Sequence, residues 1–225
     1  MSTRRRLAYL SKARRLAAAA SLASVATLFV STPARADETD GAYGRLDGDL
    51  LFVGAIGTGI EAGGPQLETS VSLAYLATAG PYLRYSDALG QEEARSARSL
   101  ALGVELRPLF LGRWALNLER GPAYLDLFLD SLTLRVGAVW ADDAPRGWAV
   151  RPGLELGVGL EFPLLPSGSG PYLGVEGVAR FHDADLSGNV DRDLLDRGSL
   201  LVFTVSWHQI FDAGFVDARD RRVDP

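Results

Sequence analysis

Residues 199–211, SLLVFTVSWHQIF, form the stretch whose pattern decides the fold. Large apolar side chains recur there at every second position, with Gln209 as the exception: Leu201, Phe203, Val205, Trp207 and Phe211. Small or polar side chains fill the positions between them, among them Thr204, Ser206 and His208. Successive side chains of a β-strand point to opposite faces. The stretch therefore predicts a strand with one apolar, aromatic face and one polar face.

Seven further segments of similar length show this alternation, and clusters of Gly, Pro, Asp and Ser separate them. They cover residues 46–60, 67–77, 82–89, 99–108, 132–141, 151–162 and 172–182. The clearest is 151–162, where Leu154, Leu156, Val158, Leu160 and Phe162 alternate with Gly, Glu and Arg. The pattern predicts an all-β fold, an eight-stranded antiparallel up-and-down barrel within residues 45–211.

Residues 110–131 break this pattern. Leu125, Phe128 and Leu129 have helical spacing, and Gly121-Pro122 is typical of a helix start. The same region also alternates at Leu125, Leu127 and Leu129, as a strand would. An additional strand would make the strand count odd. We therefore expect a short helix or ordered loop near 121–131, with the strand count around 110–131 left open.

The first 36 residues have the layout of a secretory signal peptide. A basic start precedes an apolar run of about 15 residues, shorter than the roughly 20 that a membrane-spanning helix needs. Ala34-Arg35-Ala36 offers small residues for cleavage, which we expect after Ala36. A polar lead-in follows at 37–44, and a polar tail whose role the sequence does not reveal occupies 212–225. The signal predicts export.

Charge and composition exclude several classes of function. Without residues 1–36 the chain has 16 basic and 28 acidic residues, a net charge of −12 over 189 residues. This charge argues against nucleic acid as a partner, because phosphates attract basic surfaces. There is no Cys, hence no disulfide, thiolate metal site or cysteine nucleophile. We expect no cofactor and no metal.

The polar positions of the predicted strands distinguish a membrane barrel from a soluble one. They carry mainly Gly, Ala and Ser, interrupted by single Glu and Arg residues, whereas a water-facing surface would favour Lys, Glu and Thr. These charges are predicted to point into the barrel and to neutralise one another: Glu68, Arg84, Glu105, Arg107, Arg135, Arg151, Glu155, Glu161, Glu176 and Arg180. The apolar positions would then face lipid, which requires a closed barrel.

Aromatic residues near the predicted strand ends fit the girdles of a membrane barrel. They are Tyr82, Tyr85, Trp114, Trp140, Trp148, Tyr172, Phe181 and Phe211. If both termini are periplasmic, the outer loops lie near residues 62–65, 90–98, 142–147 and 183–198.

An exported chain with eight alternating strands and an aromatic-ended last strand resembles the small outer-membrane barrels of the OmpA, OmpX and OmpW type. The resemblance covers most of residues 45–211 as a pattern, without shared motifs. It implies a porin-like protein of the Gram-negative cell outer membrane, with outer-membrane lipid and the barrel-assembly machinery as partners. The insertion signal would comprise Phe203, Val205, Trp207 and Phe211. The tail after Phe211 departs from the family pattern.

Three functions remain as hypotheses. The first is a non-catalytic barrel with a plugged lumen and a structural or surface-interaction role, whose ligand or solute the sequence does not name. The second is an outer-membrane lipid-modifying enzyme centred on His182, for which Ser206, His208, Asp183 and Asp185 are the residues to test. The third is a soluble periplasmic, lipocalin-like barrel that binds an apolar ligand. The eight-stranded interior is just wide enough for side chains, which favours the first. Oligomeric state is not predicted.

Overall fold

The computed structural model describes residues 43–61, 64–90, 96–118, 121–142, 147–181 and 198–215. The predicted signal peptide, the lead-in up to residue 42 and the tail from residue 216 lie outside the described residues. So does the predicted outer loop from 183 to 197, together with His182, Asp183 and Asp185.

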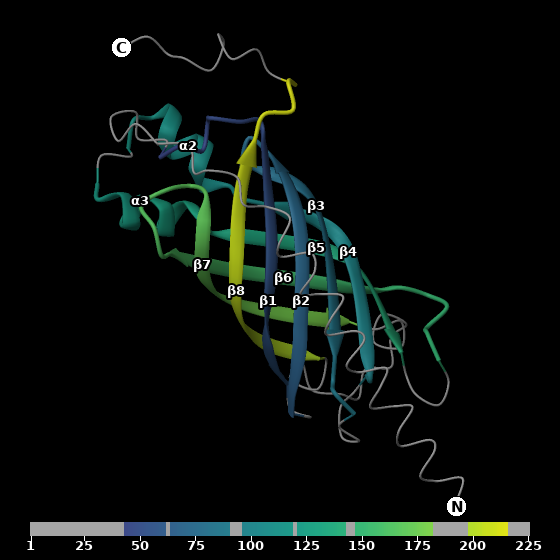
Figure 1. Cartoon of the computed structure of the whole chain (residues 1–225). Helices are drawn as coiled ribbons and strands as arrows, with labels where there is room; N and C mark the ends of the chain where they lie inside the picture. The colour runs from purple at the N-terminus through teal and green to yellow at the C-terminus, as the bar shows by residue number, and fades with distance from the viewer. Residues whose placement is uncertain are drawn as a thin grey trace, which may run out of the picture. The chain divides into compact units, whose positions relative to one another are not determined.

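Eight antiparallel strands close into a barrel, as predicted (Figure 1). They are β1 (Leu50–Glu61), β2 (Gly64–Tyr75), β3 (Ala79–Asp87), β4 (Arg98–Leu106), β5 (Thr133–Asp142), β6 (Gly153–Pro163), β7 (Gly170–Phe181) and β8 (Ser199–Phe211). Each strand pairs with its neighbour in sequence, and β1 pairs with β8, with Leu50 opposite Phe211. The last strand has the bounds that its alternation predicts.

The alternation of the sequence separates the inside of the barrel from the outside. Large apolar residues on the outward positions are about half exposed, for example Val158 at 56% and Val205 at 54%. Glu105 and Glu155, on the inward positions, have no exposed surface. The core of this barrel is therefore largely polar, and its outer surface is largely apolar.

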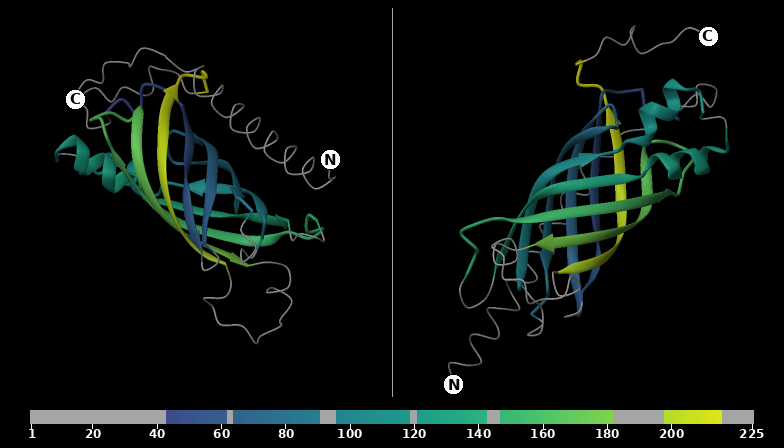
Figure 2. Two further views of the ribbon diagram at one scale, coloured as in Figure 1. Left: turned by 60° about the horizontal axis from the view of Figure 1, so that its bottom comes forward. Right: turned by 180° about the vertical axis from the view of Figure 1, so that it is seen from behind.

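Two short helices connect β4 to β5: α2 (Leu109–Ala115) and α3 (Ala123–Asp130). The helix expected near 121–131 is confirmed by α3, whereas α2 was not predicted separately. Both helices lie at the end of the barrel where β8 ends, beside the wall and extending away from it (Figures 1 and 2). Neither helix of the described part is long and apolar enough to cross a membrane.

Phe110 of α2 packs into the same end of the barrel. Its side chain is 1% exposed and lies in a cluster with Leu51 and Val53 of β1, Ala74 of β2 and the nearby Ala77. The guanidinium carbon of Arg45 lies 4.0 Å from the centre of the Phe110 ring. These contacts cover the end of the lumen with a small apolar cluster.

The segment after β8 is held by one buried carboxylate. Asp49, which has no exposed surface, accepts hydrogen bonds from the backbone N–H groups of Ala213 and Phe215 at 2.6 and 2.5 Å. Residues 212–215 therefore turn back toward the start of β1, and Phe211 remains on the outer surface, 41% exposed.

Three of the residues predicted for the aromatic girdles lie elsewhere. Tyr82 and Tyr172 are only 1% and 3% exposed because they occupy inward positions of β3 and β7. Trp114 of α2 packs against the Phe110 cluster. An aromatic residue near a strand end belongs to a girdle only if its position faces outward. The prediction used nearness to the strand end alone and did not consider which face the position occupies.

Candidate functional site

Alternating positive and negative side chains cross the lumen, and we call this set the charge ladder. In chain order it contains Glu68, Arg84, Glu105, Arg107, Arg135, Glu155, Glu161, Glu176, Arg180 and His208. Its members come from β2 to β8 and from the residue that follows β4. Among the described strands only β1 contributes none, since its inward positions carry small or apolar residues up to Gly59.

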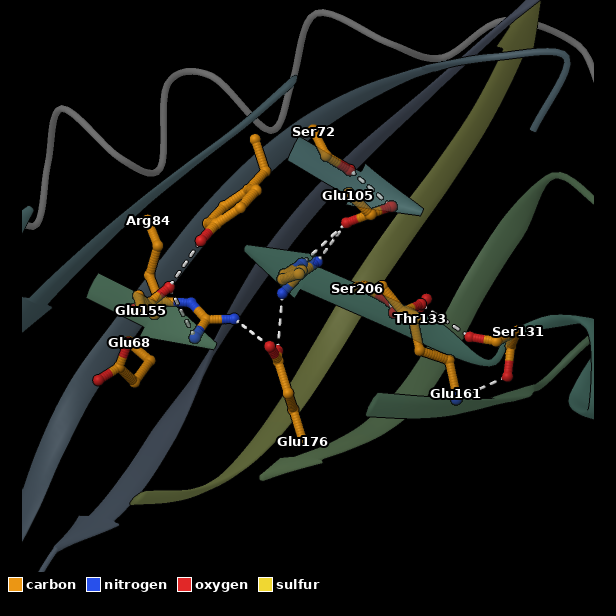
Figure 3. A network of polar contacts seen from close by, with 12 residues as sticks. Glu68, Ser72, Arg84, Glu105, Ser131, Thr133, Glu155, Glu161, Glu176 and Ser206 are labelled. Carbon is orange, nitrogen blue, oxygen red and sulfur yellow. Dashed lines mark hydrogen bonds and ion pairs between the residues drawn. The ribbon is translucent and has the colours of Figure 1, made fainter. Parts of the chain in front are cut away.

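The first half of the charge ladder lies toward the loops opposite the helices. Arg180 lies 3.6 Å from Glu68 and donates to Oε2 of Glu155 at 2.7 Å. Arg84 then links Oε1 of Glu155, at 3.3 Å, to Oε1 of Glu176, at 2.5 Å. Figure 3 shows Arg84 between these two carboxylates. The two Arg84 contacts join β3 to β6 and β7 across the lumen, whereas Arg180 and Glu155 face each other on the neighbouring strands β7 and β6.

The second half continues toward the helices. Arg135 bridges Oε2 of Glu176, at 2.7 Å, and Oε2 of Glu105, at 2.6 Å. Arg107 donates to the other oxygen of Glu105 at 2.9 Å and to Glu161 at 3.1 Å. Each link places a guanidinium between two carboxylates, so no member of this half carries an uncompensated charge.

Few polar atoms of this crowded interior lack a hydrogen bond. Within the described residues these atoms are Oε1 of Glu68, Nη1 of Arg84 and Oγ of Ser99, and the Arg84 nitrogen still has Glu155 at 3.3 Å. A charge buried alone would cost several kcal/mol. The alternation of sign is what allows so many charges inside one small barrel.

Glycines of β4 and β5 make room for Tyr82, which is part of this interior. The Tyr82 hydroxyl donates to Oε1 of Glu155 at 3.0 Å. A Cβ atom on Gly137 would lie 2.5 Å from that hydroxyl, and one on Gly103 would lie 2.8 Å from the ring. A side chain at either position would collide with Tyr82 and with the backbone of the neighbouring strand.

We expect Gly137→Ala to lower the free energy of unfolding by about 1–3 kcal/mol, because overpacking forces side chains and backbone apart. Urea unfolding of the refolded barrel measures this. Gly112→Ala is the matched control: no atom lies within 4 Å of a Cβ there, and its helical position should gain up to about 1 kcal/mol. Equal effects of the two variants would contradict the close packing on Tyr82.

Glu161 ends the charge ladder beside the two polar residues of β8 that were considered for catalysis. It accepts a hydrogen bond from Ser206 at 2.6 Å, and its other oxygen lies 3.1 Å from Nε2 of His208. The His208 ring stacks on Tyr172 at 3.9 Å between ring centres. Nucleophilic catalysis needs the base to contact the hydroxyl. Here the Glu161 carboxylate lies between Ser206 and His208 and contacts both, so the two do not form a nucleophile–base pair.

The structure brings together nine of the ten charged residues predicted for the lumen. The exception is Arg151, which is exposed and precedes β6. Pro152 follows it, and since proline lacks the N–H that a strand interior needs, the strand begins only at Gly153. The prediction extended the alternation two residues too far. Phe203, Val205, Trp207 and Phe211 all lie on the outer surface, where their insertion role stays a prediction.

A second polar cluster at the helix end was missed. Arg113 of α2 contacts Asp126 at 2.5 Å and Asp130 at 2.7 Å, and Asp130 also pairs with Arg45 at 2.7 Å. Tyr43 donates to Asp126 at 2.9 Å. The i, i+4 spacing of the two aspartates on a helix was the available signal.

The sequence also gave no indication that Glu161 is the partner of His208, because the two residues are 47 positions apart.

Two small spaces lie between these groups in the described part of the barrel. One cavity beside Arg107, Tyr172 and His208 and another beside Arg135, Glu161 and Glu176 each have a volume of about 20 Å³. Such a space holds about one water molecule. The described residues contain no group of three or more His, Cys, Asp or Glu side chains arranged to hold a metal ion.

No protein-family model matches the chain, and no curated protein is significantly similar to it. The class that the structure defines is therefore that of eight-stranded antiparallel closed β-barrels with a charged interior.

Proposed function

We propose that this protein is a non-catalytic β-barrel of the bacterial outer membrane, with a plugged lumen and a structural or surface-interaction role. The observation that carries the proposal is the inverted distribution of polarity. Buried carboxylates and guanidiniums fill the inside, while leucine, valine and aromatic side chains cover the outside. A barrel in water has the opposite need, since its exterior must be hydrated and its interior can be apolar.

The outer surface supports contact with lipid over most of the strand length. Among the described strand residues, the outward positions carry charge only at Asp87, Arg98 and Asp142, where β3 ends, β4 begins and β5 ends. The strands have nine to thirteen residues, and a tilted strand needs about 9–11 to cross a bilayer. The closed hydrogen bonding leaves no strand edge to lipid.

Aromatic side chains border the apolar belt at both ends. Tyr75, Phe162, Trp207 and Phe211 point outward near the helix end, each more than 40% exposed. Near the opposite end Tyr85, Trp140 and Phe181 occupy outward positions. Aromatic girdles of this kind favour the two interfaces of a membrane.

The charge ladder supports a plugged lumen. Passage of a solute would require guanidiniums to leave two carboxylates at once, and the neighbouring cavities have room for about one water each. In the proposed role, Ser206 and His208 are polar lumen residues that contact Glu161. A surface ligand would bind the loops opposite the helices.

The test is fractionation of the full chain expressed in a Gram-negative host. We expect it in the outer-membrane fraction, with a gel mobility that changes on boiling as the barrel unfolds. Recovery in the soluble periplasmic fraction would contradict the proposal and favour the lipocalin-like alternative. A change in the host's phospholipid or lipid A profile that His182→Ala abolishes would favour the lipid-modifying enzyme.

A further inference from the structure

The two helices carry an exposed apolar surface that the charge ladder does not involve. We call it the hairpin face, and it consists of Leu111, Leu116, Leu118, Tyr124, Leu125 and Leu129. Leu116 is 71% exposed, Leu118 57% and Leu125 51%. This is a concentration of large apolar side chains on two short helices and the turn between them.

The charged residues of the same helices point the other way. On α3, Asp126 and Asp130 are only 2% and 4% exposed, whereas their neighbours Leu125 and Leu129 are 51% and 38% exposed. Both carboxylates contact Arg113, and Asp130 also contacts Arg45. An amphipathic helix whose outer side faced water would expose its aspartates, whereas α3 buries both of them together with Leu127 and exposes Leu125 and Leu129.

The buried carboxylates of the hairpin are neutralised by Arg113 of α2 and by Arg45, which precedes β1. Burial acts to lower the pKa of Arg113, but its hydrogen bonds to Asp126 and Asp130 outweigh this and hold the pKa above the ordinary value of arginine. The guanidinium therefore stays charged between the two carboxylates, and the helices present their apolar side outward without exposing this ion pair.

The hairpin face is continuous with the outer belt of the barrel. Tyr124 stacks on Phe162 with 6.3 Å between ring centres, and Phe128 contacts the same ring at 6.2 Å. Phe162 occupies an outward position of β6 and is 47% exposed. Figures 1 and 2 show α3 beside the wall at this end. The aromatic side chains of Tyr75, Trp207 and Phe211 border the belt at the same end.

We propose that α2 and α3 lie in the interfacial layer of the lipid leaflet at this end of the barrel, with the hairpin face among the upper acyl chains. The partner is the phospholipid bilayer itself. Helices with one apolar side lie in the plane of such an interface, buried about 5–10 Å. This inference rests on the proposed function, because continuity with the barrel's belt is what selects lipid as the occupant.

The test uses single-cysteine probes, which the chain permits because it contains no Cys. Leu116→Cys and Leu125→Cys report on the hairpin face. Val158→Cys, an outward position in the middle of β6, is the reference for lipid, and Val150→Cys, 97% exposed in the preceding loop, is the reference for water. Each full-length variant is labelled with an environment-sensitive fluorophore in phosphatidylcholine vesicles containing lipids with a quencher at a shallow or a deep position.

We expect the probes at positions 116 and 125 to emit at shorter wavelength than the probe at 150 and to be quenched most by the shallow lipid. The probe at 158 should be quenched most by the deep lipid. If 158 is quenched while 116 and 125 behave like 150, the inference fails and the proposed function stands. If 158 is not quenched, both fail. Shielding of 116 and 125 without quenching, together with disulfide cross-linking between molecules of the same variants left unlabelled, would identify a second copy as the occupant and overturn the inference.

Discussion

Glu105→Ala should lower the free energy of unfolding of the barrel by about 3–5 kcal/mol, because it leaves two buried guanidiniums without their shared partner. Glu105 has no exposed surface and accepts hydrogen bonds from Arg107 and from two nitrogens of Arg135. Ser72 donates to the same carboxylate at 3.3 Å. Urea unfolding of the protein refolded in vesicles, followed by tryptophan fluorescence, measures the loss.

Asp87→Asn is the matched control for this prediction. Asp87 pairs with Arg98 at 3.5 Å, but the Arg98 side chain is 54% exposed. An exposed pair is worth about 0–1 kcal/mol, so this variant should unfold nearly as the unmodified chain does.

The double variant Glu105→Gln, Arg135→Met should lose less free energy of unfolding than the sum of the two single variants. Each substitution removes a charge that the other one would leave without its partner. A Glu105→Ala loss as small as the control's would refute the ladder as a stabilising element.

Val158→Arg should destabilise the barrel in bilayers by about 2–4 kcal/mol, the cost of a basic side chain facing lipid near the bilayer middle. Val158 is the sixth of eleven residues in β6 and points outward, 56% exposed. In a water-facing barrel the same change would fall within about 0.5 kcal/mol, because it touches no packed neighbour. Unfolding in phosphatidylcholine vesicles distinguishes the two environments.

Ser199→Arg supplies the depth control for this change. Ser199 is an exposed outward residue at the first position of β8, at the end opposite the helices. Near an interface the same arginine should cost only about 0–1 kcal/mol. Equal losses at positions 158 and 199 would indicate a general effect of the charge and not its depth in lipid.

The strand positions could be predicted from the sequence because the alternation has a period of two and persists for whole strands. In β8 the prediction gave both bounds, and in β6 it placed the start two residues too early, before Pro152, and the end one residue before Pro163. Which residues face inward also follows from parity. Tyr82 shares its parity with Arg84, so its inward position was readable, and the girdle prediction ignored this.

The ladder partners that come from non-adjacent strands could not be predicted, because they depend on how the strands are staggered around the closed barrel, whereas Glu105–Arg135 and Glu155–Arg180 are opposite residues of neighbouring strands. Arg84 and Glu176 are 92 residues apart, and β3 and β7 are not neighbours. Helix α2 has seven residues, too few to produce a recognisable period, and its role comes from one side chain, Phe110. The burial of Asp126 and Asp130 likewise depends on Arg113 and Arg45, which come from other segments.

The central claim is that the outward surface of the barrel faces acyl chains. Spin labels at outward strand positions test it most directly. Labels at Ile56→Cys, Leu102→Cys, Val158→Cys and Val205→Cys sample four strands around the barrel, and Val150→Cys samples a loop. In reconstituted bilayers we predict that dissolved oxygen relaxes the four strand labels strongly and a water-soluble nickel chelate relaxes them weakly, with the reverse at position 150. Strong relaxation of the strand labels by the nickel chelate would contradict a membrane barrel.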